Sequence, residues 1–118
     1  METNQTQNQT QKAVLVNGFS PSMVPSTKFT AEFMRISAEE LKRIVESVPT
    51  IENYIRHPST VSLLSRILQR PLEPKNGIYT FNGEVVILVT LAIPQRGQEV
   101  MNLEEKDIAI YRVTIKFE

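Results

Sequence analysis

The residues best suited to chemistry are His57, Ser59 and Thr60, which lie close together near the middle of the chain. His57 is the only histidine, and imidazole is the side chain that exchanges a proton near neutral pH without help. Pro58 suits a first helical turn, so we expect a helix to begin here, with N–H groups that favour an anion. A proton donor, two hydroxyls and an anion site suggest phosphate chemistry. The alternative is a surface histidine before an ordinary capped helix, since Ser and Thr at helix starts usually only cap.

Two further polar segments follow predicted strands. Residues 17–23 come directly after an apolar run, where open sheets commonly bind ligands. The alternative is a plain turn in which Phe19 fills the core. The second segment follows Pro94 and contains Gln95, Arg96 and Glu99 around a glycine. The alternative interpretation of this segment is an ordinary solvated loop.

Alternating or continuous apolar residues predict strands over 13–16, 28–36 and 110–117. Helical spacing predicts one helix from a Ser37–Glu40 capping box to about Val48, and a second from Pro58 that Pro71 ends. Asn82-Gly83 predicts a hairpin with a type I′ turn, followed by a central strand over 85–93. The order is strand, strand, helix, helix, strand, strand, strand. We therefore predict an α+β fold with a single mixed β-sheet of about five strands flanked by helices.

Composition limits the function classes. A disordered polar tail (1–12) and a single domain (13–118) are expected. Thirteen basic and thirteen acidic residues cancel, so no overall positive field favours duplex DNA. The chain has no cysteine and one histidine, so we predict no metal site and no cofactor. It has no apolar run that could span a membrane and no signal-like N-terminus, so we expect a cytoplasmic protein.

Three motifs in order resemble the viral ring nucleases: residues 17–23, then His57 with Ser59-Thr60, then Gln95-Arg96 with Glu99. The members of this family are small dimeric proteins of archaeal viruses, phages and mobile elements. They act as type III anti-CRISPRs by destroying cyclic tetra-adenylate, the messenger that activates CRISPR ancillary effectors. The resemblance runs from about Val14 to Phe117.

The resemblance implies a role for each matching position. His57 matches the general acid that protonates the leaving 5′-oxygen, and Arg96 and Glu99 match the active-site loop that holds phosphate, ribose or the attacking hydroxyl. The positions expected to contact the ligand are Asn17, Phe19, Ser20, Met23, Arg56, Ser59, Thr60 and Gln95. We thus expect a homodimer that encloses one cyclic tetra-adenylate. It would cut the ring without a metal into linear di-adenylates with 2′,3′-cyclic phosphate ends.

The chain departs from the family pattern at three places. Arg56 to Thr60 replaces Gly-His-Asp-Ser-Thr, Ser20 to Met23 replaces Ser-Ile-Asn-Met, and Asn76-Gly77 replaces Asn-Arg. Arg56 is either a phosphate ligand or a solvated cation. The rival functions are a non-catalytic cyclic-oligoadenylate binder, acting as a sponge or sensor, and a small interaction protein whose loops do no chemistry.

Overall fold

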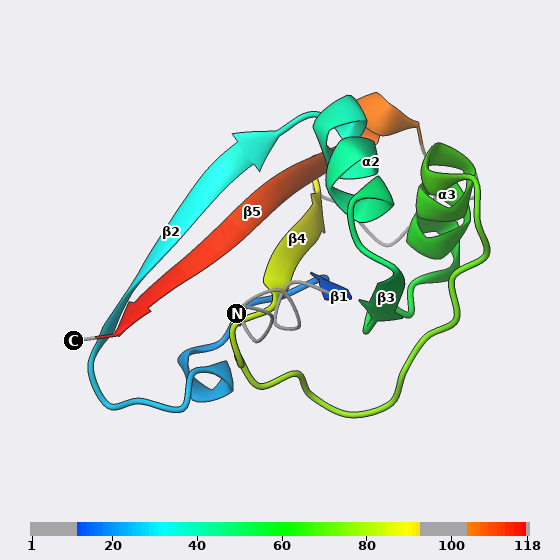
Figure 1. Cartoon of the computed structure of the whole chain (residues 1–118). Coiled ribbons are helices and arrows are strands. Elements are labelled where there is room, and N and C mark those ends of the chain that lie inside the picture. Colours follow the sequence, from blue (N-terminus) through cyan, green and yellow to red (C-terminus); the bar gives the residue numbers. More distant parts are fainter. Residues whose placement is uncertain (1–11, 93–103, 118) are drawn as a thin grey trace, which may run out of the picture.

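The computed structural model describes residues 12–92 and 104–117. It contains one five-stranded sheet in the order β2-β5-β4-β1-β3 (Figure 1). The strands are β1 (Lys12–Val16), β2 (Phe29–Ile36), β3 (Thr50–Asn53), β4 (Val85–Leu91) and β5 (Ile108–Phe117). The helices are α2 (Ala38–Glu46) and α3 (Pro58–Leu68), with short 3-10 turns η1 (Pro21–Met23) and η2 (Glu105–Asp107). The predicted α+β class and the single mixed sheet are confirmed.

One side of the sheet is parallel and the other side is antiparallel. β1 pairs in parallel with both β3 and β4, while β5 runs antiparallel to β4 and to β2. Ala13, Val14 and Leu15 are completely buried, as expected for a parallel strand covered on both faces. Lys12, which we had placed in the polar tail, is the first residue of β1. The remainder of the predicted tail, residues 1–11, lies outside the described residues.

The two faces of the sheet are covered differently. The two helices lie over one face, where Leu41 of α2 and Leu64 of α3 pack with Leu15 and Ile87 (Figure 1). Segments without regular secondary structure contribute to the cluster on the other face. The buried residues of this second cluster are Val14, Val16, Met23, Val24, Tyr79, Phe81, Val86, Leu88 and Val113.

Both helices begin near the predicted residues and end slightly earlier than predicted. Ser37 accepts the N–H of Glu40 at 3.1 Å and donates its own N–H to the Glu40 carboxylate at 2.8 Å, which confirms the capping box. α3 ends at Leu68 because Gln69 adopts the left-handed conformation, with φ 57°. Neither described helix is long and apolar enough to cross a membrane.

The predicted hairpin at Asn82-Gly83 is wrong. A type I′ turn needs positive φ at both central residues, whereas only Gly83 has it (φ 87°). Both edges of β4 are already paired, with β1 and β5, so a strand before Val85 has no edge to join. Phe81 instead donates its N–H to the carbonyl of Met23 at 2.8 Å, and its side chain is buried.

A further strand, β3, was not predicted; it lies between the two helices in the chain and at the edge of the sheet. Pro74 bridges to Asn53, and Lys75 donates its N–H to the Asn53 carbonyl at 2.7 Å, so residues 74–75 cover part of this edge. The Lys75 ammonium lies 2.6 Å from the Glu52 carboxylate, and this hydrogen bond holds the pKa of Glu52 below its usual value. The strand is thus tied to the segment that follows α3.

Candidate active site

Three parallel strands end at the same edge of the sheet, and several predicted site residues gather there. Asn17 follows β1, and His57 stands four residues after β3. These residues lie around a cavity of about 260 Å³. Its lining consists of Asn17, His57, Thr60, Val89, Thr90 and Leu91. The structure therefore brings Asn17, from one predicted segment, together with His57 and Thr60, from another.

His57 is the N-cap of α3, and its ring is oriented by Thr60. The Thr60 N–H donates to His57 Nδ1 at 3.4 Å, and Thr60 Oγ1 lies 3.2 Å from the same nitrogen. Because a backbone N–H can only donate, Nδ1 accepts this bond and the neutral ring carries its proton on Nε2. The Val61 N–H donates to the His57 carbonyl at 2.9 Å, which fixes the backbone as well. Nε2 is therefore the nitrogen left to meet a ligand.

Thr60 is buried, with 5% of its surface exposed. Its hydroxyl can either donate or accept, so it can follow a change in the protonation of Nδ1. Ser59 is half-buried in the first turn of α3, and Arg56 is exposed directly before His57. Thr60 thus orients the histidine, in addition to the ligand contact that the sequence predicts for it.

The 17–23 segment has a mainly structural arrangement. The Phe19 ring packs edge-on against Phe33 and Phe81, with centroids 5.4 and 5.9 Å away. Met23 is buried, and its sulfur accepts the N–H of Ser20 at 3.2 Å. Phe19 thus takes the packing role that was the alternative interpretation of this loop. Ligand contacts by Phe19, Ser20 and Met23 stay predictions, since none of the three lines the cavity.

Gln95, Arg96 and Glu99 lie outside the described residues. The described chain stops at Ala92, one residue after Leu91 of the cavity lining, and resumes at Glu104. The Ala92 N–H donates to the Asp107 carbonyl at 2.8 Å, so the residues flanking this segment are joined. The end of β4 and Ala92 thus lie at the same edge of the sheet as His57.

Two residues near His57 were missed by the sequence analysis. Thr90 lines the cavity from the end of β4, and the one hydroxyl in an otherwise apolar run was a usable signal. Asn53 is the last residue of β3 and is 3% exposed. No pattern in the sequence marks it, because β3 has only four residues and most of them are polar.

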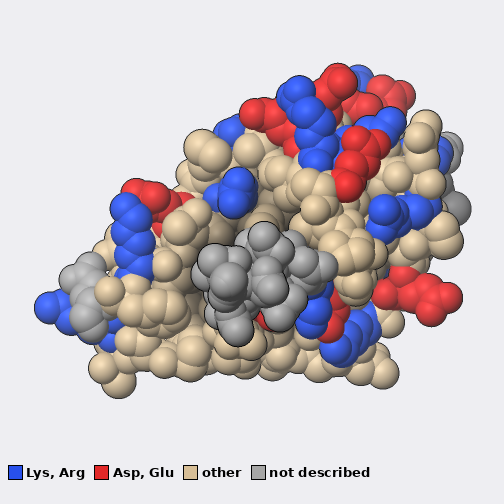
Figure 2. Space-filling model, viewed as in Figure 1, with Lys and Arg blue, Asp and Glu red and all other residues tan. Residues whose placement is uncertain are grey.

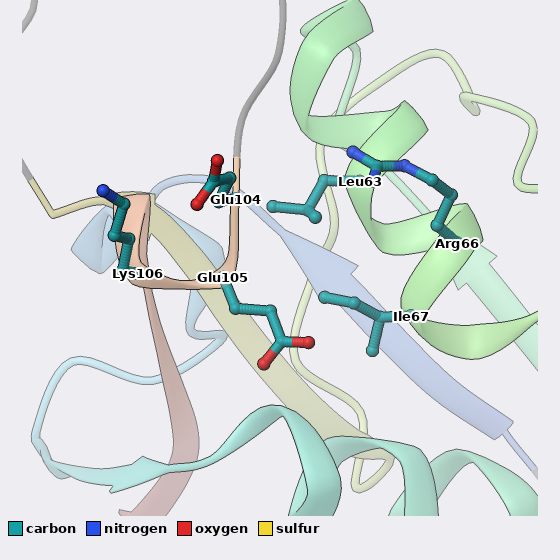
Figure 3. Close-up of a pocket in the computed structure, with 6 residues that line it drawn as sticks. All are labelled: Leu63, Arg66, Ile67, Glu104, Glu105 and Lys106. Carbon is teal, nitrogen blue, oxygen red and sulfur yellow. The ribbon is translucent and has the colours of Figure 1, made fainter.

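Three other hollows in the described part contain none of the predicted site residues. A shallow groove of about 460 Å³ has Leu63, Arg66 and Ile67 of α3 on one side, and Glu104 to Lys106 on the other (Figure 3). On the face shown in Figure 2, basic and acidic side chains intermingle over α2 and do not form a patch of one sign. Neither feature is the kind of concentrated positive surface that a polyanion would need.

Comparison with known proteins gives a family and a fold. A protein-family model described as STIV B116-like matches residues 13–118. Among solved structures, the chain resembles B116 of Sulfolobus turreted icosahedral virus, with a TM-score of 0.65 and 20% identity. The match covers 86% of this chain and 97% of the viral protein. No curated protein matches the sequence. Since the family model spans nearly the whole chain, the protein belongs to the STIV B116-like family.

Proposed function

We propose that the protein is a metal-independent ring nuclease that cleaves cyclic tetra-adenylate and so acts as a type III anti-CRISPR. The observation that carries the proposal is the orientation of His57, whose Nδ1 is held by Thr60 and whose Nε2 is left for a ligand. The motifs shared with the viral ring nucleases support it, and membership of a family named after a viral protein is consistent with it.

The proposed reaction uses the nucleophile that RNA itself carries. The 2′-oxygen forms a bond to its own phosphorus and the bond to the 5′-oxygen breaks, which leaves a 2′,3′-cyclic phosphate. The 2′-hydroxyl releases its proton to Glu99 or to solvent, and the 5′-oxygen takes a proton from Nε2 of protonated His57. In that protonated ring, Nδ1 no longer accepts the Thr60 N–H, and Nδ1–H can instead donate to Thr60 Oγ1, 3.2 Å away. Arg96 is proposed to hold the phosphate.

A two-fold dimer around one ring is part of the proposal, as the resemblance to the viral ring nucleases implies. The cavity volume of about 260 Å³ lies below the roughly 300–1,000 Å³ typical of sites for drug-sized ligands, and a cyclic tetranucleotide is larger than those. One chain would hold only part of the ring. Two chains would contribute two copies of His57 and Arg96, so each ring would be cut at two symmetric bonds.

The test is to incubate the full chain with labelled cyclic tetra-adenylate in EDTA and to separate the products by chromatography. The proposal predicts linear di-adenylate from the natural ring. A ring carrying 2′-O-methyl groups should be bound but left intact, because its nucleophile is blocked. If the natural ring stays intact yet binds, the protein is a sponge or sensor. If it neither binds nor breaks, the proposal is wrong.

A further inference from the structure

Apart from tyrosine, two polar residues are buried in the described part of the chain, and both are close to His57 in the sequence. They are Asn53, four residues before it, and Thr60, three residues after it. A buried polar side chain is costly unless its hydrogen bonds are made, so each needs a specific set of partners. Thr60 has the His57 ring as its partner. The partner of Asn53 is the backbone that leads into His57.

The Asn53 side chain makes two hydrogen bonds to Ile55. Asn53 Oδ1 accepts the Ile55 N–H at 3.0 Å, and Asn53 Nδ2 donates to the Ile55 carbonyl at 2.9 Å. Both backbone groups of Ile55 are thus held by one side chain. The Ile55 side chain is completely buried in the core beneath the helices. Ile55 is therefore fixed through its backbone and through its side chain.

The connection from β3 to α3 consists of only four residues, 54–57. Tyr54 donates its N–H to the Leu15 carbonyl at 2.8 Å, which ties the start of the connection to β1. His57, at its end, is tied to α3 through Val61 and Thr60. Asn53 holds the middle of the connection. A shift at Ile55 would reach His57 through a single intervening residue.

We propose that Asn53 is a positioning residue for His57, acting through the backbone of Ile55. Its effect on cleavage depends on the proposed function, whereas its effect on the orientation of the histidine does not. Asn53 touches no substrate in this account. Its role is to keep His57 where Thr60 can hold Nδ1.

The variants for the test are Asn53→Ala and Asn53→Asp, with Val113→Ala as the control. Asn53→Ala removes both hydrogen bonds, while Asn53→Asp fills nearly the same volume and keeps an acceptor for the Ile55 N–H. Val113 lies in β5 and is buried in the cluster on the face away from the helices, so Val113→Ala destabilises the fold without removing any hydrogen bond of the connection. If Asn53→Ala does not fold, the measurements on Asn53→Asp test the proposal instead.

The first measurement is NMR of the imidazole nitrogens, which is unambiguous because His57 is the only histidine. Wild type and Val113→Ala should show the neutral ring with its proton on Nε2. Asn53→Ala should show a mixture of both tautomers, and Asn53→Asp an intermediate spectrum. A folded Asn53→Ala or Asn53→Asp variant with the wild-type spectrum would overturn the proposal. This readout holds even if the protein cleaves nothing.

The second measurement is single-turnover cleavage of cyclic tetra-adenylate. A displacement of about 1 Å in a catalytic group can cost on the order of 100-fold, so we expect Asn53→Ala to lose 10- to 100-fold in rate with little change in Kd. Combined with His57→Ala, it should cause no further loss, because its effect passes through the histidine. If the rate loss of the double variant equals the product of the two single losses, Asn53 does not act through His57. Failure of wild type to cleave would count against the proposed function alone.

Discussion

Replacing His57 by asparagine or alanine separates the two tasks that the structure gives this residue. His57 caps α3 through Nδ1 and is the proposed proton donor through Nε2. Asparagine is among the best N-cap residues, because its side-chain oxygen accepts the same helix N–H, but it cannot act as a general acid near neutral pH. Alanine can perform neither task. The pair therefore tests capping and catalysis independently.

The expected magnitudes follow from the geometry. A cap is worth about 0.5–2 kcal/mol, and the 3.4 Å contact from Thr60 N–H to Nδ1 is long, so His57→Ala should cost about 0.5–1 kcal/mol. For a chain of this size that corresponds to a decrease in Tm of roughly 2–5 °C. His57→Asn should keep the wild-type Tm or exceed it. Both variants should lose about 10²- to 10⁴-fold in cleavage rate while still binding the ring.

Thermal unfolding followed by circular dichroism gives the Tm, and single-turnover cleavage of cyclic tetra-adenylate gives the rate. Ser37→Ala is the matched control, since it removes a cap of similar worth from α2, away from the cavity. It should lower the Tm and leave the rate unchanged. The reasoning is refuted if His57→Asn cleaves within about tenfold of wild type, a loss smaller than general acid catalysis contributes. A His57→Ala variant as stable as wild type would refute the capping role.

Three further predictions concern other parts of the chain. Gln69→Gly should raise the unfolding free energy by about 0.5–1 kcal/mol in denaturant titration, because glycine adopts the left-handed C-cap without strain; a decrease would contradict this. The Lys75 hydrogen bond lowers the pKa of Glu52 in the folded protein. The Glu52 carboxylate therefore stabilises the fold at any pH above its unfolded pKa of about 4.5. This stabilisation is lost as the pH falls through the pKa of Glu52 in the folded protein. Wild type should therefore be more stable than Glu52→Gln at pH 7, with the difference shrinking below pH 4.5, and a pH-independent difference would be the contrary result. Arg96→Ala should weaken binding of the ring by roughly 10- to 100-fold in calorimetry, and an unchanged Kd would remove Arg96 from the site.

Local sequence patterns predicted most of the helices and strands, because a few neighbouring residues were enough to specify each of them. The continuous apolar run at 13–16 and the Ser37–Glu40 pair specified β1 and the start of α2 without help from the rest of the chain. The Asn82-Gly83 prediction failed for a non-local reason. The turn signal does not reveal that β1 and β5 already occupy both edges of β4. β3 was missed because a four-residue edge strand needs no strong apolar pattern.

The meeting of Asn17 with His57 was predictable, because residues that follow parallel strands gather at one edge of a sheet. The roles of Thr60 and Asn53 were not. In the sequence Thr60 is one of two hydroxyls after the proline, whereas its burial and its contact with Nδ1 depend on how α3 packs. Asn53 gains its importance from the burial of Ile55, which only the assembled core determines.

Mass spectrometry of the products that the full chain forms from cyclic tetra-adenylate in EDTA is the most direct test of the proposed cleavage. We expect linear di-adenylates with a 5′-hydroxyl and a 2′,3′-cyclic phosphate, because the 2′-oxygen attacks its own phosphorus and His57 protonates the 5′-oxygen. Products with 5′-phosphate ends would mean that water attacked instead. Those products, or a ring that stays intact, would show that the proposed cleavage is wrong.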